Sequence, residues 1–71
     1  MSINEVIRKR QKERGIPVTT LADRTGIEYE ALRVSLNGNR KISAHEFVAL
    51  CKELDLKLED FDEHEIVSGL R

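Results

Sequence analysis

The chain has 71 residues, 12 Lys or Arg against 13 Asp or Glu, a net charge of −1 and one cysteine. This length fits one domain near the lower limit of what a hydrophobic core stabilises without disulfides or metals. One cysteine excludes an internal disulfide, no Cys/His cluster offers a zinc site, and no apolar run of about 18 residues or basic-then-apolar start predicts a membrane span or secretion signal. We therefore expect a soluble, cytoplasmic all-α bundle without metal or cofactor.

The first predicted helix is capped by Ser2, with Glu5 three residues on, and ends at Arg14 before Gly15. Its apolar stripe at helical spacing consists of Ile3, Val6, Ile7 and the stem of Arg10. The other face carries Arg8, Lys9 and Lys12. This basic face is either merely solvated or, if it lies beside the start of the second helix, close to phosphates.

The second predicted helix has Pro17 in its first turn, where a missing N–H costs no intrahelical bond. Val18, Thr19 and Thr20 complete that turn. A helix N-terminus offers free N–H groups to an anion. The two threonine hydroxyls either add to such an anion site or simply cap the helix.

The third predicted helix spans Glu28 to Leu36 and has two different faces at about 100° per residue. One face is small or apolar and consists of Ala31, Leu32, Ser35 and Leu36. The opposite face presents Tyr29, Glu30, Arg33 and Val34. At roughly 13 Å long, the helix suits a DNA major groove about 12 Å wide. The alternative is an ordinary amphipathic surface helix.

The fourth predicted helix opens with a capping box of Ser43 and Glu46. Its apolar residues at spacings of 3, 4 and 7 are Phe47, Leu50, Cys51 and Leu54. We expect Cys51 to be a buried, inert thiol, because a cysteine in such a stripe behaves as a small apolar residue. His45, in the first turn, is expected to be exposed.

The second and third helices meet at Gly26, whose conformational freedom permits the sharp turn of a helix-turn-helix. Leu21-Ala22 lies before that turn, Gly26-Ile27 within it, and Asn37 to Lys41 after the third helix. Together with Leu32 and Ser43, this register resembles the Cro and phage-repressor (XRE-like) family from about Ile3 to Phe61. The resemblance implies a four- to five-helix, lambda-repressor-like bundle over residues 1–61.

The resemblance also assigns the DNA contacts. Base-reading candidates are Glu28, Tyr29, Glu30, Arg33 and Val34; phosphate candidates are Thr19, Thr20, Asn37, Asn39, Arg40 and Lys41. Arg33 suits guanine, since its fork donates to O6 and N7 together, while Val34 suits a thymine methyl. A carboxylate of Glu28 or Glu30 could accept from cytosine N4, and Tyr29 could bond a base or a phosphate.

Some positions depart from the family pattern. Leu36 stands where an acidic residue is common, so the usual partner of Arg10 is missing. Ser35 replaces a larger residue and leaves the contact to the first helix open. The glutamates suit the N-terminus of the third helix but repel a DNA backbone.

The C-terminal part is expected to close the bundle with a fifth helix beginning at residues 58–61, with Leu56, Leu58 and Phe61 in the core. The acidic tail at 62–71 either frays or contacts a second copy. Residues 1–41 carry nine basic and five acidic side chains, and residues 42–71 carry three and eight. The basic half can face DNA while the acidic half faces away, unless the asymmetry is accidental.

The expected function is a sequence-specific double-stranded DNA-binding transcriptional regulator, of the small phage or mobile-element repressor type. It would bind a palindromic operator as a homodimer, with half-sites one helical turn apart. The alternative is a helix-turn-helix used for protein binding, as in an antitoxin or adaptor. An enzyme is not expected, because the sequence has no HExxH and no glycine-rich phosphate loop, and no small-molecule ligand is evident.

Overall fold

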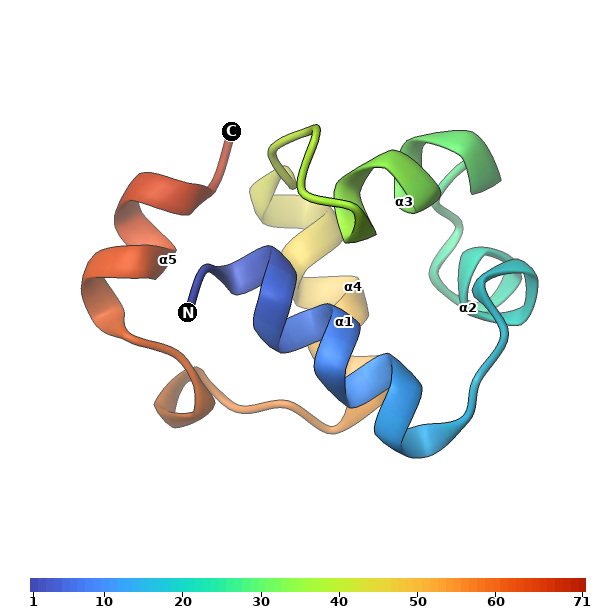
Figure 1. Ribbon diagram of the computed structural model, residues 1–71, viewed down its shortest axis with the longest axis horizontal. Coiled ribbons are helices and arrows are strands. Elements are labelled where there is room, and N and C mark those ends of the chain that lie inside the picture. The colour runs from blue at the N-terminus through green and yellow to red at the C-terminus, as the bar shows by residue number, and fades with distance from the viewer.

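The computed structural model describes residues 1–71 as five α-helices and one 3₁₀ turn (Figure 1). The elements are α1 (Ile3–Arg14), α2 (Val18–Thr25), α3 (Tyr29–Leu36), α4 (Ala44–Leu54), η1 (Leu58–Asp60) and α5 (Glu63–Gly69). The expected all-α bundle is confirmed. None of the helices has the length and apolar character needed to cross a membrane.

Local capping sets the ends of the two longest helices. The hydroxyl of Ser2 accepts from the backbone N–H of Glu5, and that of Ser43 accepts from Glu46, both at 3.2 Å. Each glutamate carboxylate accepts in return from the backbone N–H of its serine, which completes a capping box. Gly15 ends α1 in the left-handed region at φ 64°. These three sequence predictions, the two capping boxes and the stop at Gly15, are confirmed.

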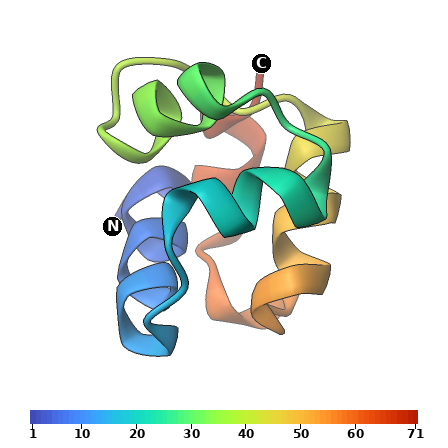
Figure 2. The same ribbon diagram turned by 90° about the vertical axis from the view of Figure 1, so that its right-hand side faces the viewer.

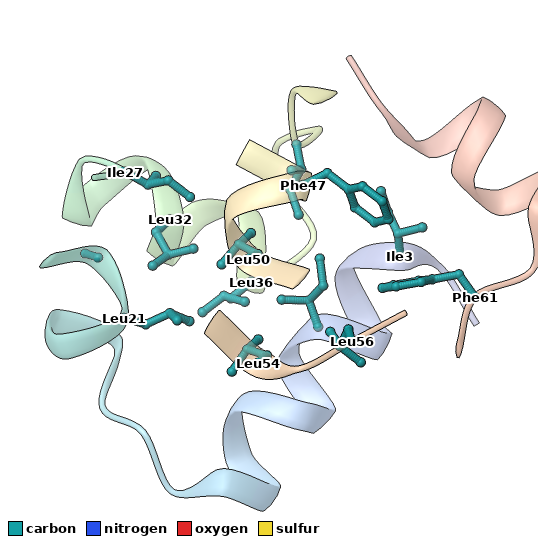
Figure 3. Packing of buried hydrophobic residues seen from close by; sticks show 13 residues of the cluster. Ile3, Leu21, Ile27, Leu32, Leu36, Phe47, Leu50, Leu54, Leu56 and Phe61 are labelled. Carbon is teal, nitrogen blue, oxygen red and sulfur yellow. The ribbon is translucent and has the colours of Figure 1, made fainter. Parts of the chain in front are cut away.

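Thirteen apolar side chains form one core (Figure 3). Its members are Ile3, Ile7, Leu21, Ala22, Ile27, Leu32, Leu36, Ile42, Phe47, Leu50, Leu54, Leu56 and Phe61. Leu50 and Leu54 on α4 are completely buried, and the rings of Phe47 and Phe61 lie 5.0 Å apart. Burying one such side chain contributes about 1.5–3 kcal/mol, and α4 packs these side chains against α1 and α2.

The C-terminal segment differs most from its prediction. Residues 58–61 form only the short turn η1, and the last helix starts later, at Glu63. Leu56 and Phe61 are buried as expected, whereas Leu58 is 67% exposed, so its predicted core position was wrong. The carboxylates of Asp60 and Asp62 accept from backbone N–H groups in this segment. This local polar bonding ends η1 at Asp60 and delays the start of α5 to Glu63.

The tail at 62–71 is folded onto the bundle, so fraying, one of the two alternatives, is not observed. The backbone N–H of Arg71 donates to the carbonyl of Ile42 at 2.9 Å, and Leu70 forms a parallel bridge with Ile42. Gly69 lies so close to Ile3 that an added Cβ would be 3.1 Å from its Cγ1. Figure 1 shows α5 beside the N-terminal end of α1.

Two further expectations are corrected. Arg10 does not lack partners: its guanidinium donates to the carbonyls of Leu54 and Asp55, at 2.9 and 3.1 Å. It thereby satisfies carbonyls at the end of α4, where a positive charge is also favoured by the helix dipole. Cys51 packs against the core but is only partly buried, and burial raises the pKa of its thiol. His45 is exposed, as expected.

Candidate nucleic-acid interface

The turn between α2 and α3 has the geometry of a helix-turn-helix. Gly26 takes φ 74°, and its N–H donates to the carbonyl of Ala22 at 2.9 Å. Thr25 closes the last turn of α2 by donating its hydroxyl to Leu21 at 2.8 Å, and Ile27 enters the core. Figure 2 shows the result: α2 and α3 stand together at one end of the molecule.

The two faces of α3 are as the sequence predicts. Its inner face contains Leu32, Ser35 and Leu36, all buried, with Ala31 packed against the core. On the outer face Tyr29, Glu30 and Arg33 are exposed, and Val34 is half-buried. An exposed mixed face of this kind is available to a ligand while the inner face holds the helix in place.

Glu28 lies just before α3 rather than in its first turn. It is the N-cap residue, and its carboxylate accepts from the backbone N–H of Glu30 at 2.9 Å. A carboxylate at this position satisfies an otherwise free N–H and is favoured by the helix dipole. Glu28 therefore has a structural function whatever it contacts outside the protein.

Arg33 points outward and is paired with Glu30 on the same helix. Its Nε lies 3.0 Å from Oε1 of Glu30, and its Nη2 lies 2.6 Å from Oε2. This hydrogen-bonded pairing raises the pKa of Arg33 and lowers that of Glu30. The planar fork is thus already oriented by a bidentate contact with a carboxylate.

The first turn of α2 lacks a side-chain cap. Pro17 is the N-cap residue, one position earlier than expected, and offers no acceptor group. Thr19 is exposed and Thr20 is half-buried, and neither hydroxyl bonds to the first-turn N–H groups. The capping alternative is therefore not observed, which leaves these N–H groups open to an anion.

Two hollows border α3 and bring distant residues to it. One of about 440 Å³ lies between α2 and α3 and includes Thr19, Glu28 and Tyr29. The other, of about 240 Å³, lies where α1 meets the end of α3. Its lining residues are Arg8, Gln11, Lys12, Val18, Arg33, Leu36 and Asn37.

The basic stripe of α1 is therefore part of the same surface as Arg33. The sequence showed Arg8 and Lys12 four residues apart on one helical face. It left open whether this face meets the second helix, and Val18 in the shared hollow shows that it does. Arg8 and Lys12 were not among the residues chosen from the sequence as DNA contacts.

The loop after α3 presents some of the predicted phosphate contacts outward. Asn37 ends the helix, and Gly38 reverses the chain at φ 83°. Asn37, Asn39 and Lys41 are exposed. The ammonium of Lys41 donates to the carbonyl of Ser68 at 3.2 Å, a contact that links the loop to α5.

Arg40 faces inward from the same loop. Its guanidinium donates to both carboxylate oxygens of Glu46, at 3.0 and 2.9 Å, and to the hydroxyl of Ser35 at 2.9 Å. The bond with Arg40 lowers the pKa of Glu46 to about 2, helped by the N–H of Ser43. The sequence predicts a phosphate contact here, but the structure uses the side chain to fasten the loop to α3 and α4.

Asn4 is a buried polar residue that sequence reasoning missed. Its side-chain amide donates to the carbonyl of Ser35 at 2.7 Å and to that of Arg40 at 3.0 Å. These bonds join α1 to the end of α3 and to the loop, so the small Ser35 does not weaken that contact. The available signal was a polar residue between Ile3 and Ile7, on the buried side of α1.

Comparison with known families agrees with this arrangement. The model of the Cro/C1-type HTH DNA-binding domain matches residues 6–65, which extends from α1 into α5. No curated protein and no solved structure matches the chain.

Proposed function

The chain belongs to the Cro/C1-type helix-turn-helix DNA-binding family, and on this basis we propose a sequence-specific repressor of the small phage or mobile-element type. It binds a palindromic operator as a homodimer. The family itself is one of DNA-binding domains used in transcription regulation and is not a family of enzymes. The observation that supports sequence-specific binding best is the exposed outer face of α3, with Arg33 beside the basic hollow of α1.

In the proposed complex α3 lies in the major groove. Arg33 exchanges the carboxylate of Glu30 for the O6 and N7 of guanine, which is the commonest specific arginine contact. The released carboxylate, or that of Glu28, accepts from a cytosine N4. Val34 contacts a thymine methyl, and Tyr29 bonds a base edge or a phosphate.

Phosphates on either side of the groove are bound by residues that flank α3. The first turn of α2 contributes Thr19 and Thr20, and the loop contributes Asn37, Asn39 and Lys41. We add Arg8 and Lys12, because the structure places them beside Arg33 and Asn37 in one hollow. For Arg40 we propose a positioning role, since its ion pair with Glu46 holds the loop that carries these contacts.

The test is selection of bound duplexes from a random DNA pool at near-physiological salt, with wild type and Arg33→Ala in parallel. We expect a palindromic consensus with half-sites one turn apart, which the mutation relaxes at one position of each half-site. Arg24→Ala, an exposed arginine on α2 outside both hollows, should leave the consensus unchanged. No enrichment by a folded wild-type protein would reject the proposal.

A protein-binding function is the second candidate. It is supported by two carboxylates, that of Glu28 at the N-terminal end of α3 and that of Glu30 on its outer face. Glu30 already neutralises Arg33. Retention on heparin separates the two. Retention that salt releases supports DNA binding, whereas no retention of the folded protein supports a protein partner.

A further inference from the structure

An apolar strip is exposed around Leu58, far from α3 along the chain. Leu58 is 67% exposed, Val67 on α5 is 78% exposed and Val48 on α4 is 53% exposed. We define the Leu58 strip as Val48, Cys51, Leu58, Ile66 and Val67. Scattered exposed apolar residues are normal, but a continuous group with a polar rim marks an interaction surface.

Two hollows lie along the Leu58 strip, and Leu58 lines both of them. The first, of about 400 Å³, is lined by Phe47, Val48, Cys51, Lys52, Asp55, Leu56 and Leu58. The second, of about 510 Å³, is lined by Leu58, Glu59, Phe61, Glu63, Ile66 and Val67. A projecting leucine beside two apolar hollows has the shape needed both to insert into a partner and to receive one.

The charged residues that form no ion pair have opposite signs at the two hollows, since Asp55 at the first hollow is already paired with Arg14. Lys52 lines the first hollow and forms no ion pair, and Glu59 and Glu63 line the second and form none. A two-fold contact is self-complementary, so that residue i of one copy meets residue j of the other and the reverse. A two-fold axis close to Leu58 therefore places each Lys52 against the partner's acidic hollow.

We propose that the Leu58 strip is the surface through which two copies of this chain form a dimer. Each Leu58 enters a hollow of the other copy, and Lys52 pairs with Glu59 or Glu63 across the axis. The inference rests on the proposed function for the role of the dimer on an operator. The surface itself is argued from exposure, shape and charge.

The position of the strip fits this role. η1 and α5 lie at one end of the molecule, and α2 and α3 lie at the other (Figures 1 and 2). Dimer formation through the strip thus leaves α3 uncovered. Half-sites about 34 Å apart require each α3 to lie about 17 Å from the two-fold axis. The chain is long enough for this distance, since its longest extent is 29 Å.

The first experiment measures self-association by sedimentation equilibrium without DNA. Leu58→Glu and Val67→Glu should each raise the dimer dissociation constant at least tenfold, because both put a carboxylate into the apolar contact. Both side chains are largely exposed, so we expect unchanged circular dichroism and thermal midpoints. Lys57→Glu is the matched control for charge, since Lys57 is exposed but lines neither hollow.

A charge exchange tests the pairing itself. Lys52→Glu, and separately the double change Glu59→Lys with Glu63→Lys, should each weaken the homodimer by bringing like charges together. Mixing the two variants should restore a dimer, because a heterodimer has opposite charges at both contacts related by the axis. If mixing restores no association, the proposed pairing is overturned.

The DNA experiment separates this proposal from the proposed function. On a selected palindrome, Leu58→Glu should bind no more tightly than it binds a single half-site, with half-site affinity equal to wild type. If the wild-type protein dimerises through the Leu58 strip but selects no DNA sequence, only the proposed function is rejected. A Leu58→Glu protein that matches wild type in both self-association and palindrome binding would overturn the surface.

Discussion

Two arginines of neighbouring segments each pair with a glutamate, yet in different surroundings. Arg33 and Glu30 lie on one helix with side chains 44% and 59% exposed, whereas Arg40 and Glu46 join a loop to α4 and are 23% and 16% exposed. Exposed ion pairs contribute about 0–1 kcal/mol and exchange easily with other partners. A shielded pair resists exchange, because losing one partner leaves the other charge unsatisfied. The first arginine is therefore available to an outside ligand, while the second holds the loop.

The largest expected effect is that of Arg40→Ala on folding. It should lower the free energy of unfolding by about 3 kcal/mol, because the carboxylate of Glu46 would stay partly buried without its partner. Urea denaturation measures this, and Arg33→Ala is the matched control, with a loss below about 1 kcal/mol. Equal losses for the two variants would contradict the difference between the pairs.

Acid should remove the contribution of the Arg40–Glu46 pair. The pKa of Glu46 is about 2 in the folded chain, whereas its ordinary value is 4.5. The ionised carboxylate therefore stabilises the fold fully above pH 4.5. That stabilisation is lost as the pH falls from about 4.5 toward 2, and amounts to about 3 kcal/mol. The free energy of unfolding, measured across this pH range, should fall for wild type by about that amount more than for Glu46→Gln.

Arg33→Ala should act on DNA recognition and not on folding. We expect a loss of about 1–3 kcal/mol at one base pair of the half-site, since the bidentate contact to guanine disappears. Competition binding with duplexes substituted at single positions measures it. An unchanged order of preference would remove Arg33 from direct readout.

Lys41→Ala should weaken binding to all sequences about equally. A phosphate contact carries no base information, so its loss should reduce the slope of log K against log salt by about one. Lys57→Ala, at an exposed lysine outside both hollows that border α3, is the control and should leave the slope unchanged. Weakening confined to one duplex sequence would contradict the phosphate role of Lys41.

The smallest expected effect is that of Glu30→Gln on stability. We expect less than about 0.5 kcal/mol, because its ion pair with Arg33 is exposed to solvent. Glu46→Gln, the same substitution in the shielded pair, should cost several times more at neutral pH. Thermal or urea unfolding of the two variants compares the pairs directly, and a large loss for Glu30→Gln would show that exposure does not separate them.

Local sequence rules predicted the features that depend on neighbouring residues. The capping boxes at Ser2 and Ser43 and the stop at Gly15 each involve residues a few positions apart, and all were confirmed. The two faces of α3 were also confirmed, since helical periodicity alone decides which side chains share a face.

Errors arose at one local turn that the sequence pattern did not reveal and where the deciding contact is distant in sequence. Leu58 matched an apolar pattern, but the short turn η1 directs it to solvent. In the acidic tail, for which fraying was one of two alternatives, α5 forms and packs against Ile3 and Ile42. Asn4 reaches residues 31 and 36 positions away, which no local pattern reveals.

By itself, the sequence determined the all-α class, the helix-turn-helix register and the outward face of α3, because capping, periodicity and glycine conformations act over a few residues. Only the tertiary structure decided which charged residues are free. It placed Arg40 against Glu46, Arg10 at the end of α4, and Arg8 beside Arg33. The physical reason is that the availability of a charge depends on the groups that packing brings to it, and these come from other helices.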